Sequence, residues 1–327
     1  MRLRVKLSTL LLALALFTLA ACGGSTGGSP STSTQGLSFT DATGTTVTLA
    51  KPPTRVACLV GVCEDILATL GIDPVAVNDT MGQDPHFFGD HAKSFARIGG
   101  QFFDPTVEDI AKATPDLVIG LANTHERLRD ALKPIAPLYI MNPASYTDSI
   151  KYLKDIGRLT GKSSVADAAA KKFQDKLDAY KAQSPKSKST LLMYGADTNF
   201  NIFTQGSLFG TVLDQVTSYP FPPPTAGAPT ASDHEPGAIP YSVDKILAKD
   251  PDTLLIASFA FAPGAQTLSK QLAANPAWSH LKAVKDGQVF EVNPTYYIFG
   301  RGTISLGLAL DDAMTRLYPS VFPKPLA

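Results

Sequence analysis

Cysteine is scarce in this sequence, with three residues in a chain of 327. Cys58 and Cys63 lie close together, but a CxxxxC spacing without further cysteine or paired histidine is a poor metal signature. In an oxidising compartment the two could form a disulfide. Cys58 falls in a predicted strand and Cys63 in the first turn of the next predicted helix. That placement does not favour disulfide geometry, so two small buried side chains are the alternative.

Long apolar runs are also lacking. The run at the N-terminus, Leu10–Ala21, is shorter than the roughly 20 residues that a membrane-spanning helix needs. It follows three basic residues, and residues 1–21 are therefore interpreted as a secretion signal. The sequence LAAC that ends at Cys22 resembles the bacterial lipobox, which implies a lipid on Cys22. Residues 22–36 are small and polar and predict a flexible tether.

Neither charge is in excess, because 29 basic residues face 29 acidic ones. Removing the signal takes away three basic residues and no acidic ones, which leaves 26 basic against 29 acidic residues, a balance of −3. A basic surface for nucleic acid is not indicated, and nucleic acid is excluded as a partner.

Signatures of catalysis are missing as well. We find no serine nucleophile elbow, no pair of carboxylates on one face, and no phosphate-cradling GxGxxG after a strand. The one dense polar cluster, Asp233-His234-Glu235, falls in the irregular, proline-rich stretch Thr217–Pro240 and is interpreted as part of a solvated loop. We expect no enzymatic activity and no cofactor, with a periplasmic hydrolase as the weaker alternative.

Short apolar segments alternate with helical patterns along the mature chain, after a predicted hairpin over residues 37–49. The alternation predicts an α/β fold with parallel sheets, and about 290 residues suit two domains. The predicted strands are Arg55–Val60, Pro74–Val77, Asp116–Gly120, Leu138–Met141, Thr190–Tyr194, Thr253–Ala257 and Gln288–Val292.

The longest helical pattern, Tyr146–Gln183, lies between two similar halves. Gly161 interrupts it and is expected to end the first of two helices in the left-handed conformation. We interpret the pair of helices as a rigid strut. The predicted division is an N-terminal lobe over residues 37–145, an inter-lobe helical segment over 146–185 and a C-terminal lobe over 186–327.

Four blocks of the sequence resemble the iron-siderophore and vitamin B12 class of bacterial solute-binding proteins, which supply ABC importers. They are Arg55–Leu70, Asp104–Gly120, Ile156–Ala166 and Asn275–Val292. The resemblance implies two Rossmann-like lobes joined by a rigid helix, with one ligand held in the cleft between them. It also implies a monomeric, exported lipoprotein anchored on the periplasmic or extracytoplasmic face of the membrane.

Ligands of open parallel sheets bind outside the carboxyl ends of the strands, so the cleft is expected in the loops that follow them. Those loops are rich in aromatic residues. We expect some of these aromatic residues to pack in the core instead, including one of the two neighbouring tyrosines. The candidate ligand-binding residues are Phe102, Phe103, Asn123, His125, Asn199, Phe200, Phe259, Tyr296, Tyr297 and Arg301.

The cleft loops offer few charges, with Arg127 and Arg301 as the basic candidates. A multiply anionic ferric catecholate needs several Arg or Lys partners, so the sequence favours a weakly charged ferric siderophore. Iron is then expected only as part of the ligand. A corrinoid or haem is the alternative within the family, and a zinc or manganese site formed by His86, His91 and His125 is a weaker one.

Delivery to an ABC permease dimer is implied by the same resemblance. Family members carry one acidic residue on each lobe that pairs with arginines of the permease. Glu108 matches the position in the first lobe, and Asp244 occupies the corresponding place in the second. Both residues also suit the first turn of a helix, where a carboxylate is stabilised by the helix dipole.

Overall fold

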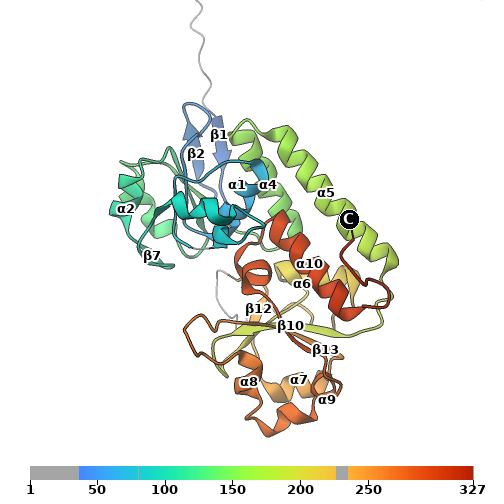
Figure 1. Cartoon of the computed structure of the whole chain (residues 1–327). Coiled ribbons are helices and arrows are strands. Elements are labelled where there is room, and N and C mark those ends of the chain that lie inside the picture. The colour runs from blue at the N-terminus through green and yellow to red at the C-terminus, as the bar shows by residue number, and fades with distance from the viewer. Residues whose placement is uncertain (1–36, 80, 226–234, 327) are drawn as a thin grey trace, which may run out of the picture. The chain divides into compact units, whose positions relative to one another are not determined.

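The computed structural model describes residues 37–79, 81–225 and 235–326. The predicted signal, the tether and Cys22 lie outside these residues. The described chain forms one compact α/β unit with two five-stranded sheets (Figure 1). No helix within the described ranges is long and apolar enough to cross a membrane.

The first large sheet is entirely parallel, with strand order β5-β4-β3-β8-β9. Every residue of its two longest strands is buried, because helices cover both faces of a parallel sheet. This confirms the predicted fold class for the first half. Its strands are β3 (Val56–Cys58), β4 (Ala76–Val77), β5 (Ala96–Arg97), β8 (Leu117–Leu121) and β9 (Leu138–Met141).

The second large sheet has the order β12-β11-β10-β13-β14, and three of its strands, β10, β13 and β14, are parallel. At one edge β11 pairs antiparallel with β10, and β12 pairs antiparallel with β11. Neither was predicted, because neither lies in a longer apolar run like those that marked β3 and β14. The strands are β10 (Thr190–Gly195), β11 (Asn201–Phe203), β12 (Ala238–Pro240), β13 (Thr253–Ser258) and β14 (Val289–Glu291).

Helices α4 (Tyr146–Leu159) and α5 (Ser163–Gln183) have the outer bounds predicted from the sequence. Gly161 separates them with a φ of 72°, as expected for a left-handed C-terminal residue. At the start of α4, Ser145 and Asp148 form a capping box. Helix α5 contributes side chains to the cores of both halves: Ala166 and Ala170 to the first, and Phe173, Leu177 and Tyr180 to the second.

A second link between the halves joins α1 (Gly61–Leu70) to α10 (Thr303–Leu317), which lies beside α5 in Figure 1. The buried carboxylate of Asp65 on α1 accepts the backbone N–H groups of Ile304 and Ser305 at 3.1 and 2.9 Å, and also the Ser305 hydroxyl. Asp65 therefore caps a helix that belongs to the other half of the chain. Burial raises the pKa of Asp65 to about 6, although these hydrogen bonds oppose the shift.

Cys58 and Cys63 form a disulfide, with Cα atoms 5.5 Å apart. The expectation that strand and helix would hold them in unfavourable geometry was wrong. Only Leu59 and Val60 separate the end of β3 at Cys58 from the start of α1 at Gly61. The first turn of α1 therefore places Cys63 close to Cys58. The disulfide fixes the start of α1 to the centre of the first sheet.

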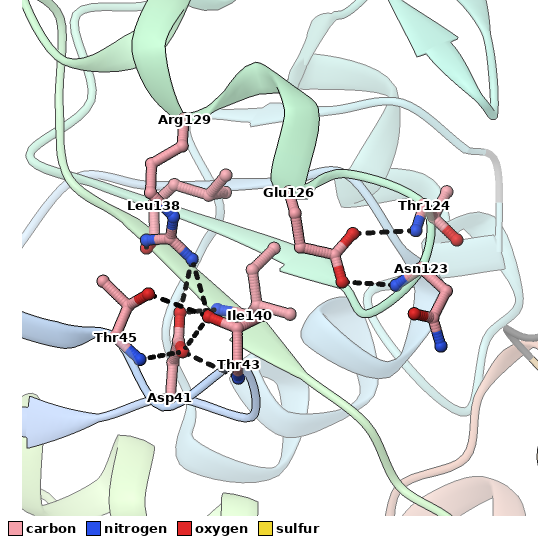
Figure 2. Close-up of polar contacts among 9 residues, drawn as sticks. All are labelled: Asp41, Thr43, Thr45, Asn123, Thr124, Glu126, Arg129, Leu138 and Ile140. Atoms are coloured by element: carbon pink, nitrogen blue, oxygen red, sulfur yellow. Dashed lines mark hydrogen bonds and ion pairs between the residues drawn. The ribbon is translucent and has the colours of Figure 1, made fainter.

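The predicted hairpin is confirmed as β1 (Leu37–Thr40) paired with β2 (Thr46–Leu49). Its turn is organised by Asp41, whose carboxylate accepts the N–H groups of Thr43 and Thr45 at 2.9 and 3.1 Å (Figure 2). Arg129 donates to the same carboxylate at 2.6 Å and to the carbonyl of Leu138 at 2.8 Å, which fastens the hairpin to the edge of the first sheet.

The remaining elements are short. After β8 the chain forms a 3₁₀ turn, η3 (Glu126–Leu128), followed directly by α3 (Arg129–Leu132). The others are η1 (Met81–Gln83), η2 (Gly89–Ser94), β6 (Gly100–Gln101), β7 (Asp104–Pro105), α2 (Val107–Lys112), α6 (Leu208–Val216), α7 (Val243–Lys249), α8 (Leu268–Leu272), η4 (Pro276–His280), α9 (Lys282–Lys285) and the π-helical turn η5 (Thr295–Phe299).

Candidate functional site

A cavity of about 500 Å³ lies between the loops of the two large sheets. Its lining follows the carboxyl ends of β4 and β5 in the first sheet and of β13 and β14 in the second, where open α/β sheets bind ligands. Its size falls within the range of small-molecule sites. The lining residues are Asn78, Asp79, Met81, Asp84, Arg97, Phe261, Thr295 and Phe299.

The two sets of loops approach each other closely at Gly61, the first residue of α1. A Cβ atom at this position would lie 2.7 Å from the carbonyl oxygen of Phe299 and 2.8 Å from the sulfur of Met81. Met81 comes from the first half of the chain and Phe299 from the second. Glycine at this position therefore lets both walls of the cavity meet over the start of α1.

One wall of the cavity is aromatic. The rings of Phe259 and Phe261 stack with their centroids 5.8 Å apart, and Phe299 lies 5.6 Å from Phe259 and 6.0 Å from Phe261. Phe261 is 68% exposed, an unusual state for such a large apolar side chain. The structure thus places the predicted residue Phe259 in a group of three phenylalanines that faces the cleft.

Asp84, His86 and Tyr296, called here the polar cluster, join the two halves at the cavity. The Tyr296 hydroxyl donates to Asp84 Oδ2 at 2.7 Å and lies 3.2 Å from His86 Nδ1, which is 2.8 Å from Asp84 Oδ1. Partial burial and the Asp84 carboxylate raise the pKa of Tyr296 to about 12. Partial burial opposes ionisation of Asp84, but hydrogen bonds from His86 and Tyr296 hold its pKa below the usual value.

The net charge of the lining is low. Arg97 is exposed, and its guanidinium donates to the backbone carbonyls of Asp79 and, at 3.1 Å, Asn78. Next to the cavity, the buried Glu64 accepts the N–H of Gly82 at 2.9 Å, and burial together with the nearby charge of Asp79 raises its pKa to about 9. Glu64 is therefore neutral at pH 7, and the lining carries two carboxylates, Asp79 and Asp84, against the single guanidinium of Arg97.

Arg301, predicted to contact the ligand, does not line this cavity. Its side chain is buried, donates to the carbonyl of Ile298 at 2.9 Å and forms an ion pair with Glu235. The interpretation of Glu235 as part of a solvated loop was therefore wrong, while Asp233 and His234 lie outside the described residues. The charge of Arg301 is compensated within the second half of the chain.

Two further candidates pack in the core of the second half. Tyr297 is fully buried, and its hydroxyl donates to the carbonyl of Ala309 at 2.9 Å and to Asp312 at 3.1 Å. Phe200 is also buried in this core. The expectation that one of the two neighbouring tyrosines packs inside holds for Tyr297, while Tyr296 reaches the cleft.

Four further candidates lie near the end of β8. Asn123 and His125 follow this strand, and Phe102 and Phe103 form the turn between β6 and β7. The rings of Phe102 and Phe103 are 5.1 Å apart, and that of Phe102 is 5.4 Å from His125. His125 is buried: its Nδ1 accepts the N–H of Leu121 at 3.0 Å, and its Nε2 donates to the carbonyl of Phe102 at 2.9 Å. His125 therefore orders the loop that follows β8. Glu126 also orders this loop, because its carboxylate accepts the backbone N–H groups of Asn123 and Thr124 (Figure 2).

The three histidines do not form a metal site. His86 pairs with Asp84, His91 pairs with Asp73 at 2.7 Å, and His125 is buried elsewhere. Within the described ranges, no group of three or more His, Cys, Asp or Glu residues has the arrangement of a metal site.

Asn199 and the two predicted docking residues lie away from the cavity. Asn199 and Asp244 both line a separate hollow of about 720 Å³ on the second half. Asp244 is exposed in the first turn of α7, and Glu108 is exposed in the first turn of α2. Both carboxylates are accessible to a partner.

None of the eight lining residues was among the candidates, and the charged or aromatic residues missed are Asp79, Asp84, Arg97, Phe261 and Phe299. Three of them lie in loops that the strand-end rule had marked, but nothing in the sequence separates them from their neighbours. Arg97 lies in β5, a two-residue strand without a recognisable pattern.

Comparison with known proteins identifies the same architecture. The periplasmic binding protein family matches residues 64–296. The chain is 26% identical over 262 residues to the Fe(3+) dicitrate-binding periplasmic protein of Escherichia coli, and the alignment covers 79% of this chain and 82% of that protein. It is 26% identical over 278 residues to the Fe(3+)-citrate-binding protein of Bacillus subtilis, with 83% of each chain covered.

A solved structure shows the same fold. The petrobactin-binding protein of Bacillus subtilis superposes with a TM-score of 0.70 at 20% identity, covering 86% of this chain and 98% of that one.

Proposed function

Because the chain belongs to the periplasmic binding protein family, we propose that it binds a ferric siderophore of low net charge in the cleft and delivers it to an ABC importer. The observation that carries the proposal is the cavity between the two sheets, which has an aromatic wall and nearly balanced charges. Relatives that bind Fe(3+) dicitrate and Fe(3+)-citrate support iron as the cargo.

The charges favour a neutral or weakly cationic iron complex. A multiply anionic ferric tricatecholate would place its charge beside Asp79 and Asp84 with only Arg97 in the lining to compensate it, and uncompensated charge is costly to remove from water. A ferric hydroxamate carries little charge, and its apolar arms can pack on Phe261 and Phe299. The cleft therefore favours the hydroxamate type.

The test is a titration of the purified mature protein with a ferric trihydroxamate and a ferric tricatecholate at matched salt. Bound iron quenches tyrosine fluorescence, and Tyr296 lies at the cavity. We expect the hydroxamate to bind at about micromolar concentration or below and the catecholate more weakly. The opposite ranking would refute the charge argument, and absence of binding by any ferric chelate would refute the function.

Attachment and delivery complete the proposal. A lipid on Cys22 holds the protein at the outer face of the membrane, with residues 22–36 as the tether. The exposed carboxylates of Glu108 and Asp244 then pair with basic residues of the permease. A globomycin-sensitive shift in the mass of the protein expressed in bacteria tests the lipid, and unprocessed mass without globomycin would exclude it.

A further inference from the structure

The polar cluster brings three different donor groups together. They are the carboxylate of Asp84, the imidazole of His86 and the hydroxyl of Tyr296. Asp84 Oδ2 lies 2.7 Å from the Tyr296 hydroxyl, Asp84 Oδ1 lies 2.8 Å from His86 Nδ1, and the hydroxyl lies 3.2 Å from the same Nδ1 atom. A hydrogen-bonded latch between the halves needs only two of these groups. The third, His86, is more than half exposed, so its contacts stabilise the fold little.

The separations suit a metal ion. A metal about 2.1 Å from each of three donors at right angles holds those donors about 3 Å apart. Carboxylate, imidazole and phenolate groups bind ferric iron well, because iron(III) is a hard ion that prefers oxygen and accepts nitrogen.

The cluster also has the right position. Asp84 and the neighbouring Thr295 line the cavity, so a metal held by the cluster would lie at its edge, within reach of a chelate in the cavity. Two donors come from the first half of the chain and one from the π-helical turn η5 of the second. A metal bound here would link the two walls of the cleft.

We propose that Asp84, His86 and Tyr296 coordinate the iron of the bound chelate directly. The inference rests on the proposed function, because it assumes that an iron chelate occupies the cleft. It specifies the class of ligand: ferric chelates that leave two or three positions on the metal open are bound more tightly than chelates that fill all six.

Coordination exchanges the hydrogen bonds of the cluster for bonds to the metal. The Tyr296 hydroxyl releases its proton to solvent as the phenolate oxygen binds iron. His86 keeps its proton on Nε2 and presents the Nδ1 lone pair, and Asp84 binds as the carboxylate. The displaced groups are the water molecules that occupied the open positions of the chelate.

The probe is the ferric nitrilotriacetate complex, in which water occupies two positions on the metal. A phenolate bound to iron(III) gives a visible charge-transfer band, so the mature protein should develop this band on mixing. Tyr296→Phe should abolish it. Tyr296→Phe and His86→Ala should each weaken binding of this chelate by about tenfold or more, while binding of a trihydroxamate that fills all six positions changes little.

Two variants serve as matched controls. Tyr241→Phe removes a half-buried tyrosine on the same half as Tyr296 but outside the cavity lining. His91→Ala removes an exposed histidine that pairs with Asp73 and packs on the ring of Phe95. Both should keep the band and the affinity.

The outcomes separate the two proposals. If the trihydroxamate binds but nitrilotriacetate gives no band, or if the band survives Tyr296→Phe, direct coordination is wrong and the proposed function stands. If neither of these chelates nor the ferric tricatecholate binds, the proposed function fails, and the coordination fails with it.

Discussion

Replacing Arg301 with alanine should damage the fold rather than the ligand site. The exposed fractions of the Arg301 and Glu235 side chains are 6% and 12%, so the ion pair is largely buried. Removing one partner of a buried pair leaves the other charge without compensation and typically costs about 3–5 kcal/mol. For a protein of this size, that corresponds to a fall in melting temperature of roughly 10 °C.

Thermal and urea unfolding of the mature protein measure this effect. Adding Glu235→Gln to Arg301→Ala should recover part of the lost stability, because the unpaired carboxylate of Glu235 is then removed as well. Arg127→Ala is the matched control: its ion pair with Asp104 is exposed on both sides, and the change should cost less than about 1 kcal/mol. Unchanged melting together with loss of ferric chelate binding by Arg301→Ala would refute this reasoning and return Arg301 to the ligand site.

Three further predictions concern other parts of the molecule. The pKa of Glu64 is raised from 4.5 to about 9 in the fold, so its contribution to stability is complete below the unfolded pKa and is lost as pH rises through about 9. In urea titrations, Glu64→Gln should therefore flatten the dependence of the unfolding free energy on pH between pH 5 and 9. If the wild type and the variant give parallel profiles, this assignment is wrong. Replacing both Cys58 and Cys63 by serine should lower the free energy of unfolding by about 2 kcal/mol, because the disulfide closes a short loop. If reduction of the wild type leaves its stability unchanged, the bond is absent. Glu108→Ala with Asp244→Ala should reduce iron uptake in cells while chelate affinity and melting stay the same, and normal uptake by the double variant would remove these residues from the docking surface.

The sequence predicted the architecture well where the pattern is long. The α4–α5 pair was predicted with its outer bounds because 38 residues of helical periodicity interrupted by Gly161 have few other interpretations. The strands β11 and β12 were missed because, unlike the equally short β3 and β14, they do not lie in a longer apolar run. Their pairing is set by neighbours in the sheet, which local sequence does not encode.

The site was predicted less well, because the sequence does not show which arginines face the cleft. The sequence marked Arg301 as a basic residue in a loop that follows a strand, but it did not mark Arg97, because the two-residue strand β5 has no recognisable pattern. Whether a guanidinium faces the cleft depends on distant partners, and Glu235 lies 66 positions before Arg301. The same limit applies to Tyr296 and Tyr297, whose opposite placements follow from the π-helical turn that contains them.

Helix α5 has a consequence for how the protein unfolds. Its first half completes the core of one sheet through Ala166 and Ala170, and its second half completes the other through Phe173, Leu177 and Tyr180. Neither core is whole without the same continuous helix, and the Asp65 cap on α10 adds a second shared element. Melting either half would expose apolar surface of the other. Calorimetry should therefore show one cooperative transition, where two independent domains would give two.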